Sequence, residues 1–362
     1  MIQYRKLRGE PEDSFAKSLL KDLAELVPCD AFYYDYVDLK HLINYKFSSP
    51  IVLIMVRDLI EDINVIRKII TSDHLFIFVT EHEGLPADIN YVGMGGSLTD
   101  EISYSTLVPP DKNFESIKIG ISLNRQMRPH RIALVSYLIG CGLSDQIHIS
   151  AMHSYKQFNK LASPDILNHL SWRFGTNHSL LKHKMSQGMT YLYNNQKQFQ
   201  IEEIYQIKEE NIVSLSNVDN FKNKLSKLYS NSFVEIVSES EYDGQPVITE
   251  KYLNSVYGRN FPIAIATPNY IRQLRSAGFD VFDDIIDHGY DLITDPVDRL
   301  RYAIDKNMHL FQNSIKQLWQ DNLPRFNKNI AFAQKDMYTF FHDRAIMQYK
   351  NILCQNKLMK QI

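Results

Sequence analysis

The chain has few of the features that mark secreted, membrane-embedded or cysteine-stabilised proteins. Its three cysteines, Cys29, Cys141 and Cys354, are odd in number and far apart, which excludes a disulfide framework and a CxxC zinc site. The longest apolar run, residues 51–56, is far shorter than the roughly 20 residues that span a bilayer. The first residues lack the apolar stretch of a secretion signal. We therefore expect a cytoplasmic protein without a membrane span.

Net charge is also nearly absent. The chain has 40 Lys and Arg residues against 42 Asp and Glu residues, a formal charge of -2, so no overall field of one sign attracts a polyanion. Any nucleic-acid role must rest on a local patch. What the sequence does have is a hydrophobic fraction of 44%, enough for the cores of the two domains that 362 residues suggest.

The first part of the chain alternates between strand and helix patterns. Residues 59–70 have helical periodicity and lie between runs rich in β-branched and aromatic side chains. This alternation predicts a parallel sheet. A glycine-rich turn is expected at residues 91–97, and Pro109 and Pro110 indicate a domain linker. The predicted strands are residues 31–36, 51–56 and 75–80.

A second alternating series follows the linker. A polar stretch near residues 154–207 interrupts it and is expected to be a mostly helical insertion. After Pro296 the chain has helical patterns only. In this series strands are expected at 116–123, 147–150, 233–237 and 261–266, and helices at 129–141, 221–229, 249–257 and 270–277.

These patterns predict an α/β protein with two Rossmann-like domains facing a cleft, followed by a helical C-terminal extension. The expected boundaries are 1–112 for the first domain, 113–305 for the second and 306–362 for the extension.

Thr249, Glu250 and Lys251 are the first candidate site residues. They come after a predicted strand and a polar loop, where Thr249 is expected to cap an amphipathic helix. The free N–H groups of a helix N-terminus suit a diphosphate, and Lys251 adds a full positive charge. Glu250 either accepts hydrogen bonds from ribose hydroxyls or only complements the helix dipole in its first turn; the spacing leaves both interpretations open.

Four potential cations form a second candidate group: Arg125, Arg128, His130 and Arg131. They follow the first predicted strand of the second domain, at the sheet edge where open α/β sheets bind ligands. Clustered arginines repel one another unless an anion lies between them, so we expect a phosphate site with Arg125 and Arg128 as its main residues. The alternative is a loop held by salt bridges to carboxylates elsewhere in the chain.

Three elements resemble glycosyltransferase-like proteins of phages and large viruses: ISLNRQMRPHR at 121–131, ITEKYLNSVYGRNFPIAIATP at 248–268 and LRSAGFDVFDDIIDHGYD at 274–291. The ITEK portion is also similar to the donor-site signature of GT-B enzymes of the fucosyltransferase and exostosin type. The resemblance covers residues 118–305. Such proteins often continue TEKT where this chain has Tyr252, a departure that bears on the shape of the sugar pocket.

The resemblance implies a hexosyl- or pentosyltransferase of the GT-B type, with the acceptor on the first domain and a nucleotide sugar on the second. It implies that Glu250 binds the ribose and that Lys251 and Arg125 meet the diphosphate. It further implies that Tyr290 and Asp291 shape the far side of the donor pocket, and that a virus-encoded protein works in the host cytoplasm.

A catalytic base is expected where strands of the first domain end, because sugar transfer with inversion needs a group that removes the acceptor proton. Asp58 and Glu81 follow two such strands, although ordinary helix-capping roles fit them equally well. No metal site is expected, because the acid-rich residues 282–287 lie in a helical pattern and no histidine has a partnered ligand set. Arg, Lys and a helix dipole would replace the cation, and no cofactor beyond the donor is needed.

Basic residues outnumber acidic ones after Asp305. This excess indicates either a solvated helix that returns to the first domain or a nucleic-acid contact surface. The acceptor is accordingly a glycan or a hydroxylated base of viral DNA, which would have to be flipped or single-stranded. The competing hypothesis is a non-catalytic nucleotide-binding or structural protein with a transferase-like fold.

Overall fold

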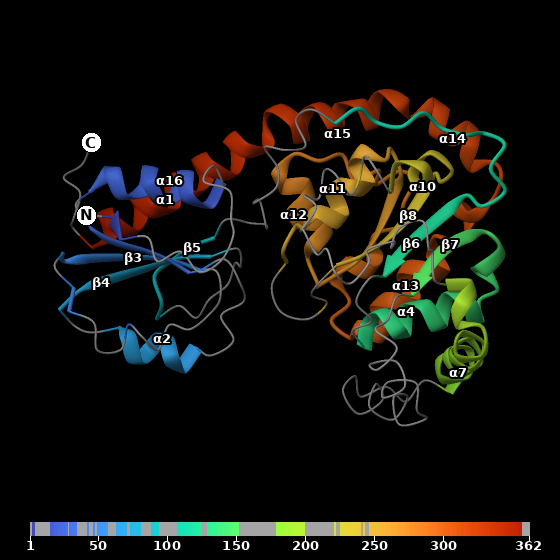
Figure 1. Ribbon diagram of the computed structural model, residues 1–362, viewed down its shortest axis with the longest axis horizontal. Helices are drawn as coiled ribbons and strands as arrows, with labels where there is room; N and C mark the ends of the chain where they lie inside the picture. Colours follow the sequence, from blue (N-terminus) through green and yellow to red (C-terminus); the bar gives the residue numbers. More distant parts are fainter. Residues whose placement is uncertain are drawn as a thin grey trace, which may run out of the picture. The chain divides into compact units, whose positions relative to one another are not determined.

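The computed structural model divides the chain into two compact units (Figure 1). The first unit contains Met1–Ser105, Gln245–Thr249 and Phe332–Ile362, and the second contains Thr106–Gly244 and Glu250–Ala331. The structure describes residues 2–3, 15–27, 29–34, 42, 46–47, 49–56, 63–70, 73–80, 88–93, 107–124, 129–151, 179–199, 221, 225–239, 242 and 246–356.

The first unit is built on a five-stranded parallel sheet with the order β1-β2-β3-β4-β5. Val52, Leu53 and Ile54 in its centre have no exposed surface, because both faces of the sheet are covered. The strands are β1 (Ile2–Gln3), β2 (Asp30–Tyr34), β3 (Ile51–Val56), β4 (Leu75–Thr80) and β5 (Tyr91–Gly93).

Helices from both ends of the chain cover this sheet. Helix α1 (Phe15–Leu26) packs on β2 and β3, and the C-terminal helix α16 (Met337–Gln355) packs on β5 and α1. Phe341 and Ala345, one helical turn apart on α16, are fully buried. Helix α2 (Ile63–Ile69) covers the other face, where Ile66 joins a cluster with β3 and β4 (Figure 1).

The second unit holds a four-stranded parallel sheet with the order β7-β6-β8-β9. Its strands are β6 (Gly120–Asn124), β7 (Ile147–Ala151), β8 (Val234–Ser238) and β9 (Phe261–Ile265). The chain adds β7 on one side of β6 and then β8 and β9 on the other, as in doubly wound sheets of order 2-1-3-4. The predicted α/β class with two parallel sheets is therefore confirmed.

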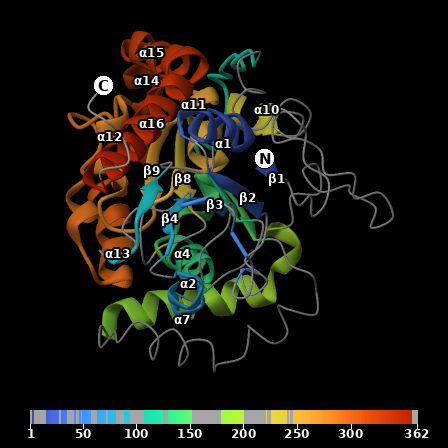
Figure 2. The same cartoon turned by 90° about the vertical axis from the view of Figure 1, so that its left-hand side faces the viewer.

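Helices lie on both faces of the second sheet (Figure 1). Helices α10 (Ser226–Ser230), α11 (Glu250–Tyr257) and α12 (Tyr270–Ala277) lie on one side, and α4 (Pro129–Gly140) and α13 (Pro296–Lys306) on the other. Helix α7 (Ser179–Asn194) packs against α4, and Figure 2 shows it lying across that helix. Helices α14 (Ile315–Asp321) and α15 (Leu323–Lys335) follow, and the 3-10 helices are η2 (Leu143–Asp145), η3 (Gln196–Phe199), η5 (Gly289–Leu292) and η6 (Met308–Phe311).

Three expectations change. Part of the predicted glycine-rich turn is strand β5, because pairing with β4 overrides the local preference of glycine. Residues 282–287 are not helical: Phe282 has φ 60, and turns and bends follow it. The predicted extension, 306–362, is divided, because residues to Ala331 belong to the second unit and the rest to the first.

No helix in the described part of the chain is long and apolar enough to cross a bilayer.

Candidate functional site

The second sheet reverses its winding between β6 and β8. These strands are parallel neighbours, with Ile121 opposite Glu235. From β6 the chain continues to β7 on one side of the pair, and from β8 it continues to β9 on the other side. In open α/β sheets a crevice forms outside the carboxyl ends of the strands at such a point. Two predicted site segments leave the sheet there: the loop before α4, which follows β6, and the loop before α11, which follows β8. We call this edge the switch edge.

Helix α11 begins at Glu250, as the ITEK element predicted. Lys251 Nζ lies 2.7 Å from Glu250 Oε1, and both side chains are partly exposed, at 24% and 33% respectively. Thr249 directly precedes the helix and is 6% exposed. The first turn thus presents a cation, a carboxylate and the N–H groups of a helix start in one place.

His130 and Arg131 have a different role from the one predicted. Arg131 donates hydrogen bonds of 3.2 Å to the carbonyl oxygens of Ser238 and Glu239, and His130 Nε2 lies 3.1 Å from the same Glu239 oxygen. Both side chains are 3% exposed. They fasten the first turn of α4 to the end of β8, and this contact corrects the expectation that they bind phosphate directly.

Glu239 is a residue that the sequence reasoning missed. It follows β8 directly, is 1% exposed, and accepts a 2.5 Å hydrogen bond from the hydroxyl of Tyr270 at the start of α12. Burial, and then the Glu239 carboxylate, raises the pKa of Tyr270 well above its ordinary value. The charge of Glu250, at the start of α11, adds to this shift in the pKa of Tyr270. A glutamate just after a predicted strand was the available signal.

Tyr290 and Tyr252 are buried in the core, and Asp291 holds the start of α12. The Tyr290 hydroxyl accepts a 3.3 Å hydrogen bond from the Ala264 N–H and is buried. The Asp291 carboxylate caps α12 by accepting from the N–H groups of residues 271 and 272. Tyr252 is fully buried against Phe279, so its departure from the TEKT pattern is absorbed by the core.

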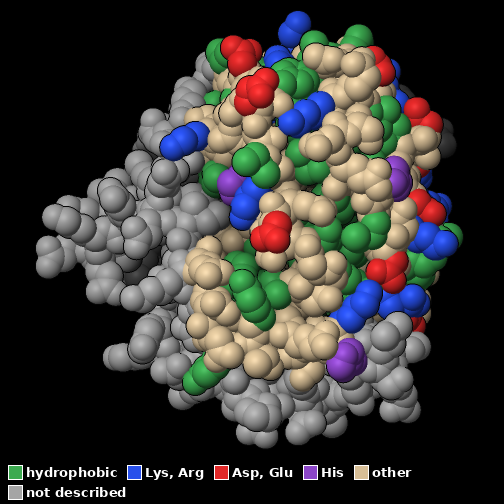
Figure 3. Space-filling model, turned by 90° about the vertical axis from the view of Figure 1, so that its right-hand side faces the viewer, with side chains coloured by type: hydrophobic (Ala, Val, Ile, Leu, Met, Phe, Trp, Pro, Cys, Tyr) green, Lys and Arg blue, Asp and Glu red, His purple; other side chains and the backbone are tan. Residues whose placement is uncertain are grey.

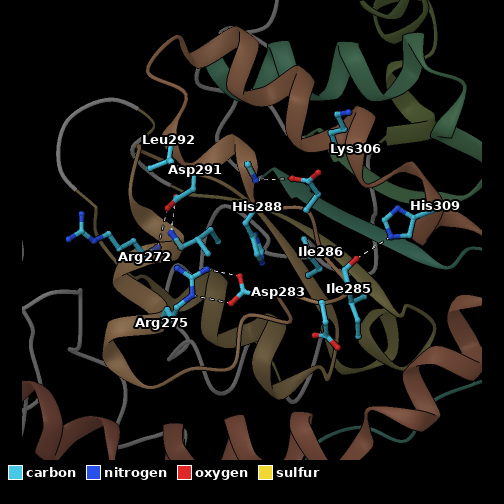
Figure 4. A pocket seen from close by; sticks show the side chains of 14 residues that line it. Arg272, Arg275, Asp283, Ile285, Ile286, His288, Asp291, Leu292, Lys306 and His309 are labelled. Carbon is cyan, nitrogen blue, oxygen red and sulfur yellow. Dashed lines mark hydrogen bonds and ion pairs between the residues drawn. The ribbon is translucent and has the colours of Figure 1, made fainter.

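A pocket of about 720 Å³ lies beside α12 and the segment 283–292 (Figure 4). Arg275 and Asp283 face each other across part of it in a two-bond ion pair of 3.0 and 2.6 Å. His288 donates from Nε2 to the Val281 carbonyl at 2.7 Å, and burial lowers its pKa. Asp291 connects this pocket to the start of α12.

Four of the predicted site residues, Asp58, Glu81, Arg125 and Arg128, lie outside the described residues. Among the residues that the structure describes, no three His, Cys, Asp or Glu side chains are grouped to hold a metal ion.

Comparison of the chain with protein-family models, curated proteins and solved structures finds no match. The function of the protein therefore has to be inferred from the switch edge and its residues.

Proposed function

We propose that the protein is a metal-independent glycosyltransferase of the GT-B type, which moves a sugar from a nucleotide-sugar donor to an acceptor hydroxyl. One observation carries the proposal: β6 and β8 are neighbours at the point where the winding reverses. The two segments predicted to bind a diphosphate therefore leave the sheet at one edge, where ligands of doubly wound sheets bind.

The ion pair at the start of α11 suits such a donor. Lys251 Nζ pairs with Glu250 Oε1 at 2.7 Å. A diphosphate at the helix N-terminus would attract Lys251 and compete for it, which leaves the Glu250 carboxylate to accept hydrogen bonds from ribose hydroxyls. This exchange resolves the conflict of an acid beside a phosphate site. In this proposal Arg125 and Arg128 complete the diphosphate site, and Asp58 or Glu81 is the base that activates the acceptor.

Titration with UDP and GDP, followed by a hydrolysis assay over UDP- and GDP-sugars, tests the proposal. We expect Lys251→Ala to weaken nucleotide binding by roughly tenfold or more, the loss of a charge-assisted contact. Lys328→Ala is the matched control, because this exposed lysine lies on α15 of the same unit. Absence of binding by both nucleotides would refute the donor site. Binding without turnover with any acceptor would favour the non-catalytic alternative.

The acceptor is proposed to be a glycan or a hydroxylated DNA base. Some of the basic residues after Asp305 have partners within the chain. Lys316 donates to the carbonyl oxygens of Phe114 and Ser116, and Arg325 pairs with Asp280. On the face seen in Figure 3, Lys and Arg side chains are interspersed with Asp and Glu among the described residues. DNA binding that falls steeply with salt, and further in Lys350→Glu, would favour DNA; its absence would favour a glycan.

A further inference from the structure

The pocket beside α12 in the second unit has a lining unlike a phosphate site. Three cationic side chains, Arg272, Arg275 and Lys306, line it together with four carboxylates. A nucleotide or a DNA phosphate would therefore meet no excess of positive charge, in contrast to the cluster expected at the switch edge. The pocket and the proposed diphosphate site thus suit different ligands.

The four carboxylates that line this pocket each accept a hydrogen bond from the chain itself. Asp283 is held by Arg275, and Asp284 by Arg325. Asp287 accepts from the Gly289 N–H at 2.8 Å, and Asp291 caps α12. With these contacts in place the carboxylates do not converge on a common point, which disfavours a metal ion as the ligand.

A neutral ligand with several hydroxyl groups fits this lining. Each carboxylate keeps lone pairs beyond the bond it already accepts, and Arg and Lys groups bring several N–H donors. A hydroxyl group can donate to such a carboxylate and accept from an Arg or Lys N–H group, and neither bond displaces an ion pair. Ile285 and the 74% exposed Leu292 add apolar walls for the C–H faces of a ring. The volume of about 720 Å³ is in the range of small-molecule sites.

From this lining we infer that the pocket bounded by α12, residues 283–292, Lys306 and His309 binds a neutral saccharide. The inference goes beyond the proposed reaction and rests on the pocket alone. If sugar transfer is also correct, the pocket supplies a place for a glycan acceptor or its neighbouring residues.

Calorimetric or NMR titration of the full chain, in the absence of nucleotide, tests this inference. The probes are glucose, galactose, mannose, N-acetylglucosamine, maltose and chitobiose, with inorganic phosphate as the anionic comparison. We expect at least one saccharide to bind, with an affinity that stays constant between about 0.1 and 1 M NaCl, where the Debye length falls from about 10 to about 3 Å. Binding of phosphate in this pocket with no saccharide bound would overturn the inference, as would no binding by any probe.

Two substitutions locate the binding. Leu292→Asp removes an apolar wall and adds a charge, and Ile117→Asp is its control, because Ile117 is 87% exposed in the same unit. Asp287→Asn keeps the oxygen that accepts from Gly289 and replaces the other, and Asp321→Asn is its control with a retained bond from Gln317.

We expect each pocket variant to weaken saccharide binding by roughly three- to tenfold, the effect of one lost apolar contact or of one hydrogen bond weakened when a carboxylate becomes an amide, and each control to leave it unchanged. Equal affinities in variants and controls would place the saccharide elsewhere and refute the inference. UDP binding is measured on the same samples. Saccharide binding without UDP binding would refute the proposed donor site and leave this inference intact, and the reverse result would do the opposite.

Discussion

The strands of the first sheet follow one another in sequence order, whereas the second sheet starts with β6 in its interior and grows to both sides. Among the described strands, only the second sheet therefore has a reversal, and with it the geometry that opens a crevice at the carboxyl ends. Among the described residues, the buried charged side chains follow the same division: at the reversal the buried Arg131 guanidinium donates to the main-chain carbonyl of Glu239, which is itself buried. Two parallel sheets of similar strands can thus differ in whether their strand order provides the geometry of a ligand crevice.

The largest effect on stability is expected from a substitution in the core of the first unit. Phe341→Ala removes a fully buried ring of α16 and should lower the free energy of unfolding of that unit by about 3–5 kcal/mol. Met347→Ala on the same helix, where the side chain is 58% exposed, should change it little. Trp319 belongs to the second unit, and Trp172, the other tryptophan, lies outside the described residues.

In a Trp172→Phe background, the fluorescence of Trp319 therefore follows the second unit, and far-UV circular dichroism follows both units. UDP binding should be retained in Phe341→Ala if the donor site depends on the second unit. Loss of UDP binding together with an unchanged fluorescence transition would show that the donor site also depends on the first unit.

A somewhat smaller loss of stability is expected from a substitution where α7 and α4 of the second unit are in contact. A Cβ at Gly188 of α7 would lie 1.8 Å from the Ser136 carbonyl oxygen of α4, and one at Gly140 would lie 2.2 Å from that of Lys184. Because backbone opposes the new atom, Gly188→Ala must push the helices apart, at a cost of about 3 kcal/mol. Gln187→Ala, at an exposed position of α7, is the control. Urea unfolding followed by the fluorescence of Trp319 measures the loss of stability. An unchanged midpoint in Gly188→Ala would contradict the close packing of α4 and α7.

The smallest effect concerns a buried carboxylate at the opposite end of the second sheet. Glu235 on β8 is 3% exposed, and burial raises its pKa from about 4.5 to about 8. Two contacts oppose this shift: the hydroxyl of Tyr229 donates to the carboxylate at 2.9 Å, and Lys112 adds a positive charge. Folding thus favours the protonated form. The associated stability is complete below about pH 4.5 and is lost as the pH rises through about 8.

Glu235→Gln stays neutral and keeps an oxygen that accepts from Tyr229. It should therefore be more stable than the wild type above pH 8, by on the order of 2 kcal/mol, and similar to it below pH 5. Thermal unfolding at pH 5 and pH 9 measures the difference. A variant whose advantage is the same at both pH values would show that Glu235 does not change its charge state in this range.

Much of the local structure was predictable because it depends on short patterns. The strands expected at 51–56 and 75–80 are β3 and β4 with the same bounds, and the helix expected at 270–277 is α12. The start of α11 at Glu250 followed from a polar loop, a capping residue and an amphipathic run. Strand β1 was missed, because a two-residue edge strand leaves no pattern and exists only through pairing with β2.

For the candidate site, the segments were predictable and the roles of several side chains were not. The residue types around Lys251 indicated an anion site from sequence. Whether an arginine faces solvent or a carbonyl depends on its neighbours in space, and Arg131 is turned inward because the end of β8 offers it two carbonyl oxygens. Glu239 was missed for the same reason, since its partner Tyr270 is 31 residues away along the chain.

Local sequence patterns specify the strands, the helices and their α/β alternation, because hydrophobic periodicity and capping act over a few neighbouring residues. Tertiary structure decided the strand order, the reversal between β6 and β8 and the burial of polar groups, because these depend on which distant segments pair. The position of a ligand crevice follows from strand order, and so only the folded chain brought the two predicted phosphate-binding segments to one edge.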